Sequence, residues 1–509
     1  MLAKVLSSAL LGIDAIMVDV EVDIAQGLPQ FSTVGLPDGA VKESKDRVKS
    51  ALKNSGYEFP NRKITVNLAP ADVRKEGASF DLPISIGILA ATGVVKAGHI
   101  KEYLLLGELS LDGGVKPIRG CLSVAVAAKK AGFRGIIVPS ENACEGAVVE
   151  GLDVIGVREL AEVVEFLNGE RAIPPHEVDI QDLIRQNSDY GEDFSEVKGQ
   201  EHAKRALEVA AAGGHNLLMI GPPGSGKTML ARRIPSILPA MSFDEAIETS
   251  KIYSVMGLLD RETALVATRP FRSPHHTISD IGLIGGGNTP KPGEVSLSHN
   301  GVLFLDELPE FKKHVLEVLR QPLEDGRVTI SRALTSLTYP SRIMLVTAMN
   351  PCKCGQSGEK SDSCTCTSRE IHQYRSRISG PLLDRIDIHI EVPAVKYRDL
   401  ADRAEGESSA AIAGRVEQAR EIQMERFRGT RVHCNAHMAS RQIRKFCEPD
   451  AGGHRLLEVV TEKLGFSARA YTRILKVART IADLEGSEAI REQHIAEAIQ
   501  YRSLDRKTL

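Results

Sequence analysis

The sequence of 509 residues contains no tryptophan, and aromatic residues make up only 4% of it. Proteins that bind single-stranded nucleic acid mainly by base stacking need such side chains, so the composition argues against that mode of recognition. The formal net charge is only −3. Any contact with nucleic acid must therefore come from a local basic surface, because the chain as a whole has no strong positive field.

The sequence also lacks an apolar run long enough to span a membrane. Lys4 and the apolar residues 5–11 imitate the start of a signal peptide, but Asp14 interrupts the run. Residues 17–23 then alternate between apolar and acidic, which is typical of a strand with one wet face. We therefore expect a cytoplasmic protein without a membrane segment, and the length predicts two to four domains.

One stretch carries a nucleotide-binding signature, the phosphate-loop pattern G-x-x-x-x-G-K-[ST]. Its glycines let backbone N–H groups point at a polyphosphate. Lys227 adds a positive charge for the outer phosphates, and the Thr228 hydroxyl is suited to Mg²⁺. The predicted nucleotide-binding residues are Gly221, Pro222, Pro223, Gly224, Ser225, Gly226, Lys227 and Thr228.

The surroundings of this loop match what the motif requires. Residues 215–220 form a short apolar run, as expected of a buried parallel strand, and a helix is predicted over about 227–234. The positive N-terminal end of such a helix favours an anion. A chance Gly-rich turn is the alternative interpretation, and the strand before it and the helix after it argue against that.

A second apolar strand, residues 301–307, ends in two adjacent carboxylates. Asp306 is predicted to hold Mg²⁺, and Glu307 is predicted to polarise the attacking water. Adjacent acids at a strand end also occur in solvated turns. Together with the phosphate loop, however, they predict hydrolysis of a nucleoside triphosphate.

A third buried strand, residues 343–348, leads to Asn350. An amide at the tip of this strand can bond the γ-phosphate or the attacking water. A turn ahead of Pro351 is the alternative role, and one residue can serve both purposes.

A β-hairpin is predicted from residues 323–332 and 335–339, between the carboxylates and the third strand. It carries Arg327 and Arg332, two cations of the kind that contact phosphates. An ion pair of Arg332 with a nearby acid, such as Glu324 or Asp325, is the alternative.

Four cysteines follow as two C-x-C pairs, Cys352 with Cys354 and Cys364 with Cys366. Disulfides are rare in cytosolic proteins. Two such pairs can surround one structural Zn²⁺ as four thiolates, and free thiols are an equally good interpretation.

Adjacent His275 and His276 lie in a Gly/Pro-rich insertion. Consecutive side chains usually point apart, so we expect loop hydrogen bonding there and not metal ligation.

Arg385 stands at the mouth of a strand predicted over 386–392. In ring-forming ATPases an arginine at this place lies at the subunit edge, where it stabilises γ-phosphate charge in the neighbour's site. A surface pair with Asp384 is the alternative.

The remainder of the chain is predicted to be helical, over 408–427, 438–447, 452–464, 467–484 and 488–502. Arg469 and Arg473 share one helix face. One of them is expected to reach over the nucleotide, and we favour Arg469, although charges on a solvated face are the usual alternative.

The first 170 residues predict a mixed α/β domain. The segment Lys75-Glu76-Gly77-Ala78-Ser79 and the helix after it resemble the nucleophile segment of Lon-type proteases. Such a site needs a lysine to activate the serine, but Leu122 occupies the corresponding position. We therefore predict a Lon-like scaffold without protease chemistry, in which Ser79 caps a helix.

Nearly the whole chain resembles the ComM/YifB type of magnesium-chelatase-like AAA+ ATPases. The phrases 213–216, 274–276, 301–307 and 379–387 carry the match. The resemblance implies ATP and Mg²⁺ as cofactors, Asn350 as sensor 1, Arg385 as arginine finger and Arg469 as sensor 2. It further implies a hexameric homo-oligomer that moves on branched or single-stranded DNA, a helicase-like role in branch migration during recombination and natural transformation.

The expected fold class is α/β, in three domains. Residues 1–170 form a Lon-protease-like (ribosomal S5 domain 2-type) domain, and 171–194 are a linker. Residues 195–395 form a parallel-sheet AAA+ domain with the Cys-rich loop at 352–366, and 396–509 form a helical lid. A magnesium-chelatase-like motor that remodels a protein partner is the alternative function, and a Lon-type protease is a weaker one because of Leu122.

Overall fold

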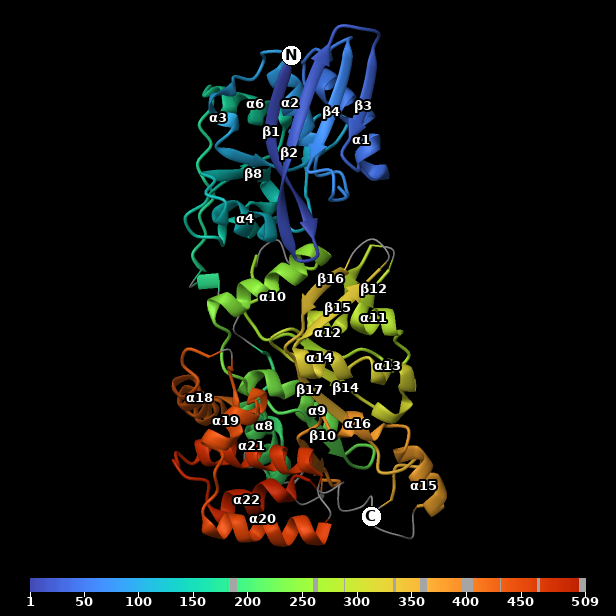
Figure 1. Cartoon of the computed structure of the whole chain (residues 1–509), viewed down its shortest axis with the longest axis vertical. Helices are drawn as coiled ribbons and strands as arrows, with labels where there is room; N and C mark the ends of the chain where they lie inside the picture. The colour runs from blue at the N-terminus through green and yellow to red at the C-terminus, as the bar shows by residue number, and fades with distance from the viewer. Residues whose placement is uncertain are drawn as a thin grey trace. The chain divides into compact units, whose positions relative to one another are not determined.

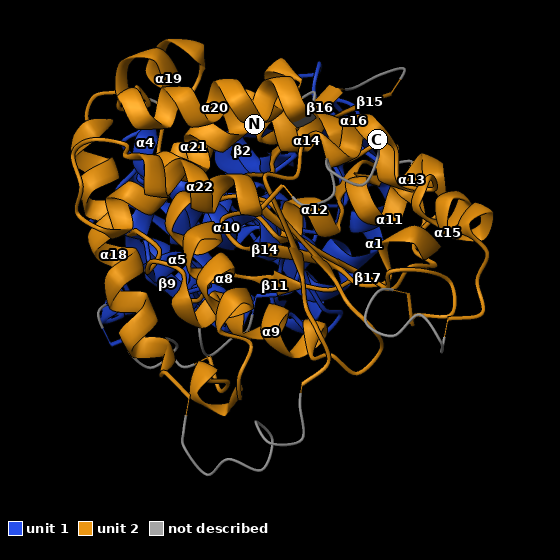
Figure 2. Cartoon of the chain, turned by 90° about the horizontal axis from the view of Figure 1, so that it is seen from below, with its two compact units in different colours: residues 1–188, 243–267 blue, residues 189–242, 268–509 orange. Residues whose placement is uncertain are grey.

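The computed structural model describes residues 1–180, 182–183, 190–259, 264–287, 289–332, 336–357, 364–395, 406–430, 432–464 and 467–502. It divides into two compact units, one of residues 1–188 and 243–267 and one of residues 189–242 and 268–509 (Figure 2). Parts of the predicted linker (181 and 184–189), of the Cys-rich loop (358–363) and of the start of the predicted lid (396–405) lie outside the described residues.

The first unit is built on a four-stranded sheet in the order β1-β2-β4-β3 (Figure 1). Its strands are β1 (Leu2–Leu11), β2 (Asp14–Ala25), β3 (Gln30–Val34) and β4 (Lys63–Ala69). The signal-like run at the start is β1, which pairs antiparallel with β2 along its whole length. The alternation predicted in β2 is present, because Val18, Val20 and Val22 are buried while the acidic residues between them are not.

Helices and a second sheet complete the core of this unit. The helices are α1 (Gly39–Asn54), α2 (Asp81–Ala91), α3 (Ala97–Ile100), α4 (Cys121–Lys130), α5 (Ala143–Ala147) and α6 (Leu160–Asn168). The further strands are β5 (Tyr103–Leu105), β6 (Glu108–Leu109), β7 (Val115–Lys116), β8 (Gly135–Pro139) and β9 (Asp153–Val157), of which β5, β8 and β9 form a parallel sheet. The prediction that Ser79 caps a helix is wrong. Helix α2 begins at Asp81, so the N-cap is Phe80 and not Ser79, and the phenylalanine side chain has no oxygen with which to cap the helix.

Helix α10 (Phe243–Met256) belongs to the first unit although it comes from the middle of the chain. It packs on α4, and the Gly120 N–H donates to the Ser254 carbonyl at 3.2 Å. Lys251 pairs with Asp14, and the Ser254 hydroxyl donates to Glu145. The sequence analysis did not anticipate this insertion, because nothing local in a helical segment shows which core it joins.

The second unit contains a five-stranded parallel sheet in the order β11-β14-β17-β10-β18. Its strands are β10 (Leu217–Ile220), β11 (Phe271–Arg272), β14 (Val302–Leu305), β17 (Met344–Met349) and β18 (Ile388–Glu391). The central strands are buried on both faces, as their continuous apolar sequences predict. Helix α8 (Glu201–Gly213) packs against the sheet core, and α9 (Lys227–Arg233) follows β10 and continues into η3 (Ile234–Ile237).

Shorter elements connect the strands. They are α11 (Asp280–Ile284), the hairpin of β12 (Gly285–Gly286) and β13 (Lys291–Pro292), α12 (Glu294–Leu297), α13 (Lys313–Glu317), α14 (Arg320–Asp325), the hairpin of β15 (Arg327–Ser331) and β16 (Ser336–Pro340), α15 (Ser368–Arg375) and α16 (Gly380–Leu383). The region after Glu307 contains two short helices, α13 and α14. Pro322 in the first turn of α14 lacks a backbone N–H and suits a helix start.

The C-terminal part of the second unit is helical, as predicted (Figure 1). Its helices are α18 (Ser409–Arg426), α19 (Ser440–Phe446), α20 (Ala451–Leu464), α21 (Ala468–Leu484) and α22 (Glu492–Gln500). Apolar side chains of α18, α21 and α22 join the strands β10, β17 and β18 in one hydrophobic core. The helices are therefore continuous with the sheet and do not form a separate core.

Candidate functional site

The phosphate loop follows β10 at the carboxyl edge of the parallel sheet, where open α/β sheets bind ligands. Gly224 and Gly226 have φ values of +75° and +84°, in the left-handed region that favours glycine. A Cβ at Gly221 would lie 2.1 Å from the Val392 carbonyl oxygen. The loop thus has the glycines that its path requires.

The Lys227 side chain is folded into this loop. Its Nζ donates to the carbonyls of Gly221 and Pro222, both at 2.8 Å, and lies 3.4 Å from the Asn350 Oδ1. Burial lowers the pKa of Lys227, and the nearby Asp306 carboxylate opposes this shift. The structure therefore brings the phosphate-loop lysine and the asparagine at the end of β17 together.

The two predicted Mg²⁺ ligands also meet. The Thr228 hydroxyl donates to Asp306 Oδ2 at 2.7 Å, at an exposed position. A hydroxyl beside a carboxylate at this edge is the oxygen donor set that Mg²⁺ takes in nucleotide sites. A residue at the start of α9, which follows β10, thus meets the residue directly after β14, because both strands end at the same sheet edge.

Glu307 occupies a strained backbone position next to this pair. Its φ and ψ are 52° and 45°, left-handed values that are uncommon for a residue with a side chain. Its backbone N–H donates to Asp306 Oδ1 at 2.9 Å. The Glu307 carboxylate is 56% exposed and lies 3.3 Å from Nδ1 of His276. The sequence analysis assigned no site role to His276, and only its place after β11, the neighbour of β14, could have indicated one.

The three arginines considered for the site differ in exposure. The Arg385 side chain is 7% exposed, pairs with Glu324 and donates to the Pro381 carbonyl. Arg473 pairs with the buried Asp387. Arg469 is 66% exposed, with Asp384 at 3.7 Å. Within this chain Arg469 is thus the one of the three that reaches into solvent.

The hairpin β15–β16 presents both of its predicted arginines to solvent. Arg327 and Arg332 are exposed, while Val328 and Ile330 between them are buried. Neither arginine forms an ion pair within the described ranges, and Glu324 pairs with Arg385 instead of Arg332. Residues 333–335 of the connecting turn lie outside the described residues.

The four cysteines form one cluster. The Sγ of Cys352 lies 3.3 Å from that of Cys354 and 3.8 Å from that of Cys364, and the Cys354 and Cys364 sulfurs are 3.6 Å apart. Cys366 joins them, so that all four Sγ atoms lie within 4.8 Å of one another. A hydrogen bond from the Gln356 backbone lowers the pKa of Cys354 to about 6. This loop touches the nucleotide site, because a Cβ at Gly355 would lie 2.6 Å from Pro223 Cδ.

The amino edge of the same sheet holds a buried polar network. His215, two residues before β10, places Nδ1 3.3 Å from Asp387 and Nε2 2.9 Å from the Thr480 hydroxyl of α21. Burial lowers the pKa of His215 to about 3. The Asn435 amide donates to Thr480 and to Asp483.

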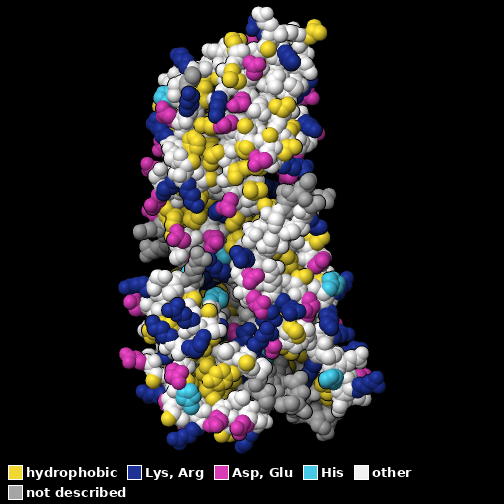
Figure 3. Space-filling view, in the orientation of Figure 1, with side chains coloured by type: hydrophobic (Ala, Val, Ile, Leu, Met, Phe, Trp, Pro, Cys, Tyr) yellow, Lys and Arg dark blue, Asp and Glu magenta, His cyan; other side chains and the backbone are white. Residues whose placement is uncertain are grey.

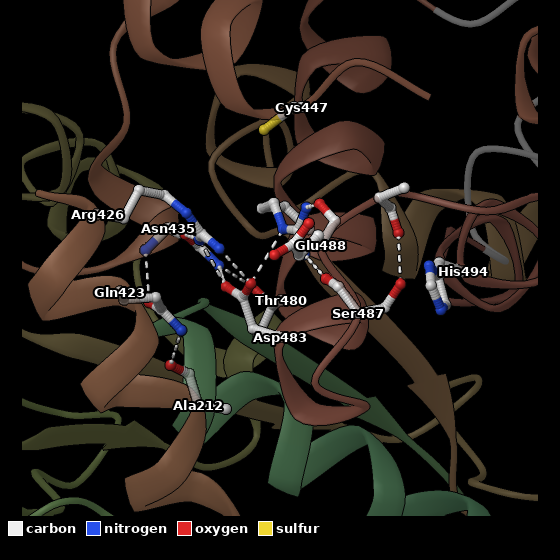
Figure 4. Close-up of polar contacts among 12 residues, drawn as sticks. Ala212, Gln423, Arg426, Asn435, Cys447, Thr480, Asp483, Ser487, Glu488 and His494 are labelled. Carbon is white, nitrogen blue, oxygen red and sulfur yellow. Dashed lines mark hydrogen bonds and ion pairs between the residues drawn. The ribbon is translucent and has the colours of Figure 1, made fainter. Parts of the chain in front are cut away.

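Two arginines complete the network around Asp483 (Figure 4). Arg426 of α18 donates to both of its carboxylate oxygens, and Arg479 donates to Oδ1 at 3.0 Å. Gln423 links α18 to α8 by donating to the Ala212 carbonyl. These contacts fasten the C-terminal helices to the elements before β10.

Three family models match the chain. "Magnesium chelatase, subunit ChlI" matches residues 193–400, which contain the whole carboxyl-edge site. "Subunit ChlI of Mg-chelatase" matches residues 20–142, and "Magnesium chelatase, subunit ChlI C-terminal" matches residues 406–502. The chain thus has an α/β AAA+-like fold of the magnesium-chelatase class.

Several curated proteins are similar over nearly the full length. The chain is 46% identical to "Competence protein ComM" of Haemophilus influenzae over 510 residues, covering 99% of this chain and 98% of the relative. It is 46% identical to "Uncharacterized protein YifB" of Escherichia coli over 507 residues, with the same coverage. The "Magnesium-chelatase 38 kDa subunit" of Rhodobacter capsulatus is 23% identical over 321 residues, 59% of this chain and 84% of the relative.

The chain belongs to the ComM/YifB family of magnesium-chelatase-like proteins. This membership makes it an AAA+-type motor and implies ATPase activity with use of ATP and Mg²⁺. Among the described helices, none is both long and apolar enough to cross a membrane.

Proposed function

We propose that the carboxyl-edge site hydrolyses ATP. The observation that carries this proposal is the 2.7 Å contact of Thr228 with Asp306, beside the exposed Glu307 carboxylate. Thr228 and Asp306 would hold Mg²⁺, which supplies charge neutralisation for the phosphates. Lys227 binds the outer phosphates, and Glu307 takes the proton of the attacking water.

Asn350 completes this site in our proposal, and Arg469 is proposed as sensor 2, a role that requires it to leave Asp384 at the amino edge of the sheet. The Asn350 amide orients the water or the γ-phosphate from the end of β17, and its 3.4 Å distance from Lys227 supports that role. Arg469 acts as sensor 2 because Arg473 is already bonded to Asp387, whereas Arg469 is exposed at the start of α21. The C-terminal helices then serve as the lid that carries this arginine.

DNA is the substrate that we propose for the motor. Charges of both signs are interspersed on the face shown in Figure 3, which accords with the net charge of −3. The grip on DNA must therefore be local, and the exposed Arg327 and Arg332 on β15–β16 are suited to it. The hairpin lies between the Glu307 and Asn350 strands in the chain, so that movements at the nucleotide could reach it. The relative named as a competence protein supports a DNA-related role.

The decisive experiment measures ATPase activity with a single-stranded oligonucleotide, a four-way DNA junction or no DNA. We expect DNA to stimulate turnover. Arg332→Ala should weaken DNA binding and flatten its salt dependence, by about one unit of log–log slope per lost contact. Basal turnover should remain, and Arg444→Ala on the exposed face of α19 is the matched control. An unchanged affinity and salt slope would remove the hairpin from the DNA path.

We further propose a homo-hexameric ring in the cytoplasm in which Arg385 acts as arginine finger on the neighbouring site. In the single chain Arg385 is held by Glu324, so this role requires the pair to open at the subunit interface. Mixing Arg385→Ala subunits with Glu307→Gln subunits should restore turnover that neither variant has alone. A mixture that forms rings and stays inactive would place the finger elsewhere.

The cysteine cluster is proposed to hold one structural Zn²⁺. Zinc–sulfur bonds of about 2.3 Å in a tetrahedron place the sulfurs about 3.8 Å apart. The sulfur separations of 3.3, 3.6 and 3.8 Å are close to this value and well beyond a disulfide bond. Protein purified without chelators should contain about one Zn²⁺ per chain. Combined Cys354→Ser and Cys366→Ser should remove it, and metal-free wild type would refute the site.

A second candidate function is a magnesium-chelatase-like motor that remodels a protein partner. The similarity to the Rhodobacter capsulatus subunit favours it, and ATPase activity indifferent to DNA would support it. Proteolysis has less support, because Leu122 cannot accept a proton from a serine nucleophile as a lysine would. We propose that the first unit is a Lon-like scaffold without protease chemistry.

A further inference from the structure

We infer that His276 is a positioning residue for Glu307, an inference that rests on the proposed hydrolysis of ATP. The imidazole Nδ1 lies 3.3 Å from Glu307 Oε2. His276 follows β11 and Glu307 follows β14, and these strands are neighbours in the parallel sheet. Both side chains therefore emerge at the edge that carries the phosphate loop.

The His276 imidazole is more restrained by its neighbours than the Glu307 carboxylate is. Its ring centroid lies 4.1 Å from that of His275 and 6.3 Å from that of Phe311, which meets it edge-on. His275 is held in turn, because its Nδ1 lies 2.9 Å from the Thr277 hydroxyl. His276 is 31% exposed, whereas Glu307 is 56% exposed. The His276 ring is thus held in place by its neighbours and can position the more exposed Glu307 carboxylate.

The backbone of Glu307 is already restrained by its left-handed conformation and by its N–H bond to Asp306. These two restraints act on the backbone, so the side-chain torsions of Glu307 depend on other contacts. Among the described residues, His276 is the one ion-pair partner of this carboxylate. The imidazole beside Oε2 favours one orientation of the carboxylate and leaves Oε1 available to a water molecule.

This arrangement affects the chemical step more than nucleotide binding. A general base must lie within about 2.6–3.2 Å of the group whose proton it takes, so a misplaced carboxylate lowers kcat. Among the described residues, the recorded ion pair and ring contacts of His276 are with Glu307, His275 and Phe311, and none is with the phosphate loop. Its loss should therefore leave the KM for ATP nearly unchanged.

Three substitutions at one position test the geometry. His276→Ala should lower kcat about tenfold, the effect of about 1.4 kcal/mol in the barrier. His276→Asn should restore most of the activity, because its amide nitrogen takes the place of Nδ1. His276→Gln places its amide nearer to Nε2 and should not restore it. His372→Ala, on the exposed face of α15, is the matched control and should behave as wild type.

The imidazole ¹⁵N signals of His276 provide a readout that does not depend on turnover. Wild type should carry the ring proton on Nδ1, and Glu307→Ala should change this tautomer preference. The inference is overturned by identical signals in both proteins, by an unchanged kcat in His276→Ala, or by equal losses in the Asn and Gln variants. Wild type that turns over no ATP would refute the proposed function, and the ¹⁵N signals would still decide the His276–Glu307 contact.

Discussion

At the carboxyl edge of the parallel sheet, Asp306 is partly exposed to solvent and Glu307 is exposed. At the amino edge Asp387 is buried, and so is Asp483 in the polar network of that edge. Asp483 is shared by Arg426, Arg479 and Asn435. The Glu307 carboxylate has His276 as its one ion-pair partner among the described residues. The carboxylate of Asp483 thus has its hydrogen-bonding capacity filled by protein groups, whereas that of Glu307 remains available to a ligand or water. A carboxylate that is to act on a ligand needs that availability, whereas one that fastens helices to a sheet must be saturated because it is buried.

The largest expected effect is at the available edge. Lys227→Ala should abolish ATP turnover, because it removes the positive charge that binds the outer phosphates of ATP. Glu307→Gln should lower it by at least about 100-fold, because the base is lost, while nucleotide binding persists. Steady-state ATPase and nucleotide-binding assays measure both changes. Lys463→Ala, at an exposed position of α20, should match wild type. Normal turnover in either site variant would refute the role of this edge.

The next largest effect is at the saturated edge. Asp483→Ala leaves two arginines without their shared partner, and breaking a buried pair costs about 3–5 kcal/mol. Asp306→Ala removes an exposed bond and should cost less than about 1 kcal/mol. Calorimetric unfolding of both variants compares the two edges directly. Equal losses of stability in the two variants would contradict the view that the carboxylates of the two edges differ in their contribution to stability.

A smaller effect should appear as a dependence of stability on pH. Burial lowers the pKa of His215 from 6.5 to about 3, so between these values the unfolded chain binds a proton at this position and the native protein does not. Stability should therefore fall as the pH decreases from about 6.5, by up to about 1.4 kcal/mol per pH unit from this residue. Denaturant unfolding at pH 7.5, 6.5 and 5.5 measures it. His215→Gln should have a shallower slope below pH 6.5, and parallel slopes would contradict the assignment.

Much of the second unit follows from local patterns. The continuous apolar runs at 215–220, 301–307 and 343–348 contain β10, β14 and β17, because strands buried on both faces need no polar alternation. The five C-terminal helices lie within a few residues of their predicted ends. The AAA+-like fold class is confirmed, while the lid role and the Lon-like nature of the first unit stay predictions.

Other features could not be predicted in this way. Helix α10 belongs to the first unit although its sequence lies between parts of the second. The burial of Arg385 against Glu324 also depends on packing, since a motif gives the residue type and not its exposure.

The sequence by itself determined the chemistry available to this protein, because the spacing of Gly221, Lys227 and Thr228 and the acids after a buried strand each require only local backbone geometry. Tertiary structure alone decided which of these groups meet. The parallel strand order brings Thr228 to Asp306 and His276 to Glu307. The physical reason is that side-chain contacts between strands depend on their order and register, and those are set by the packing of the whole core.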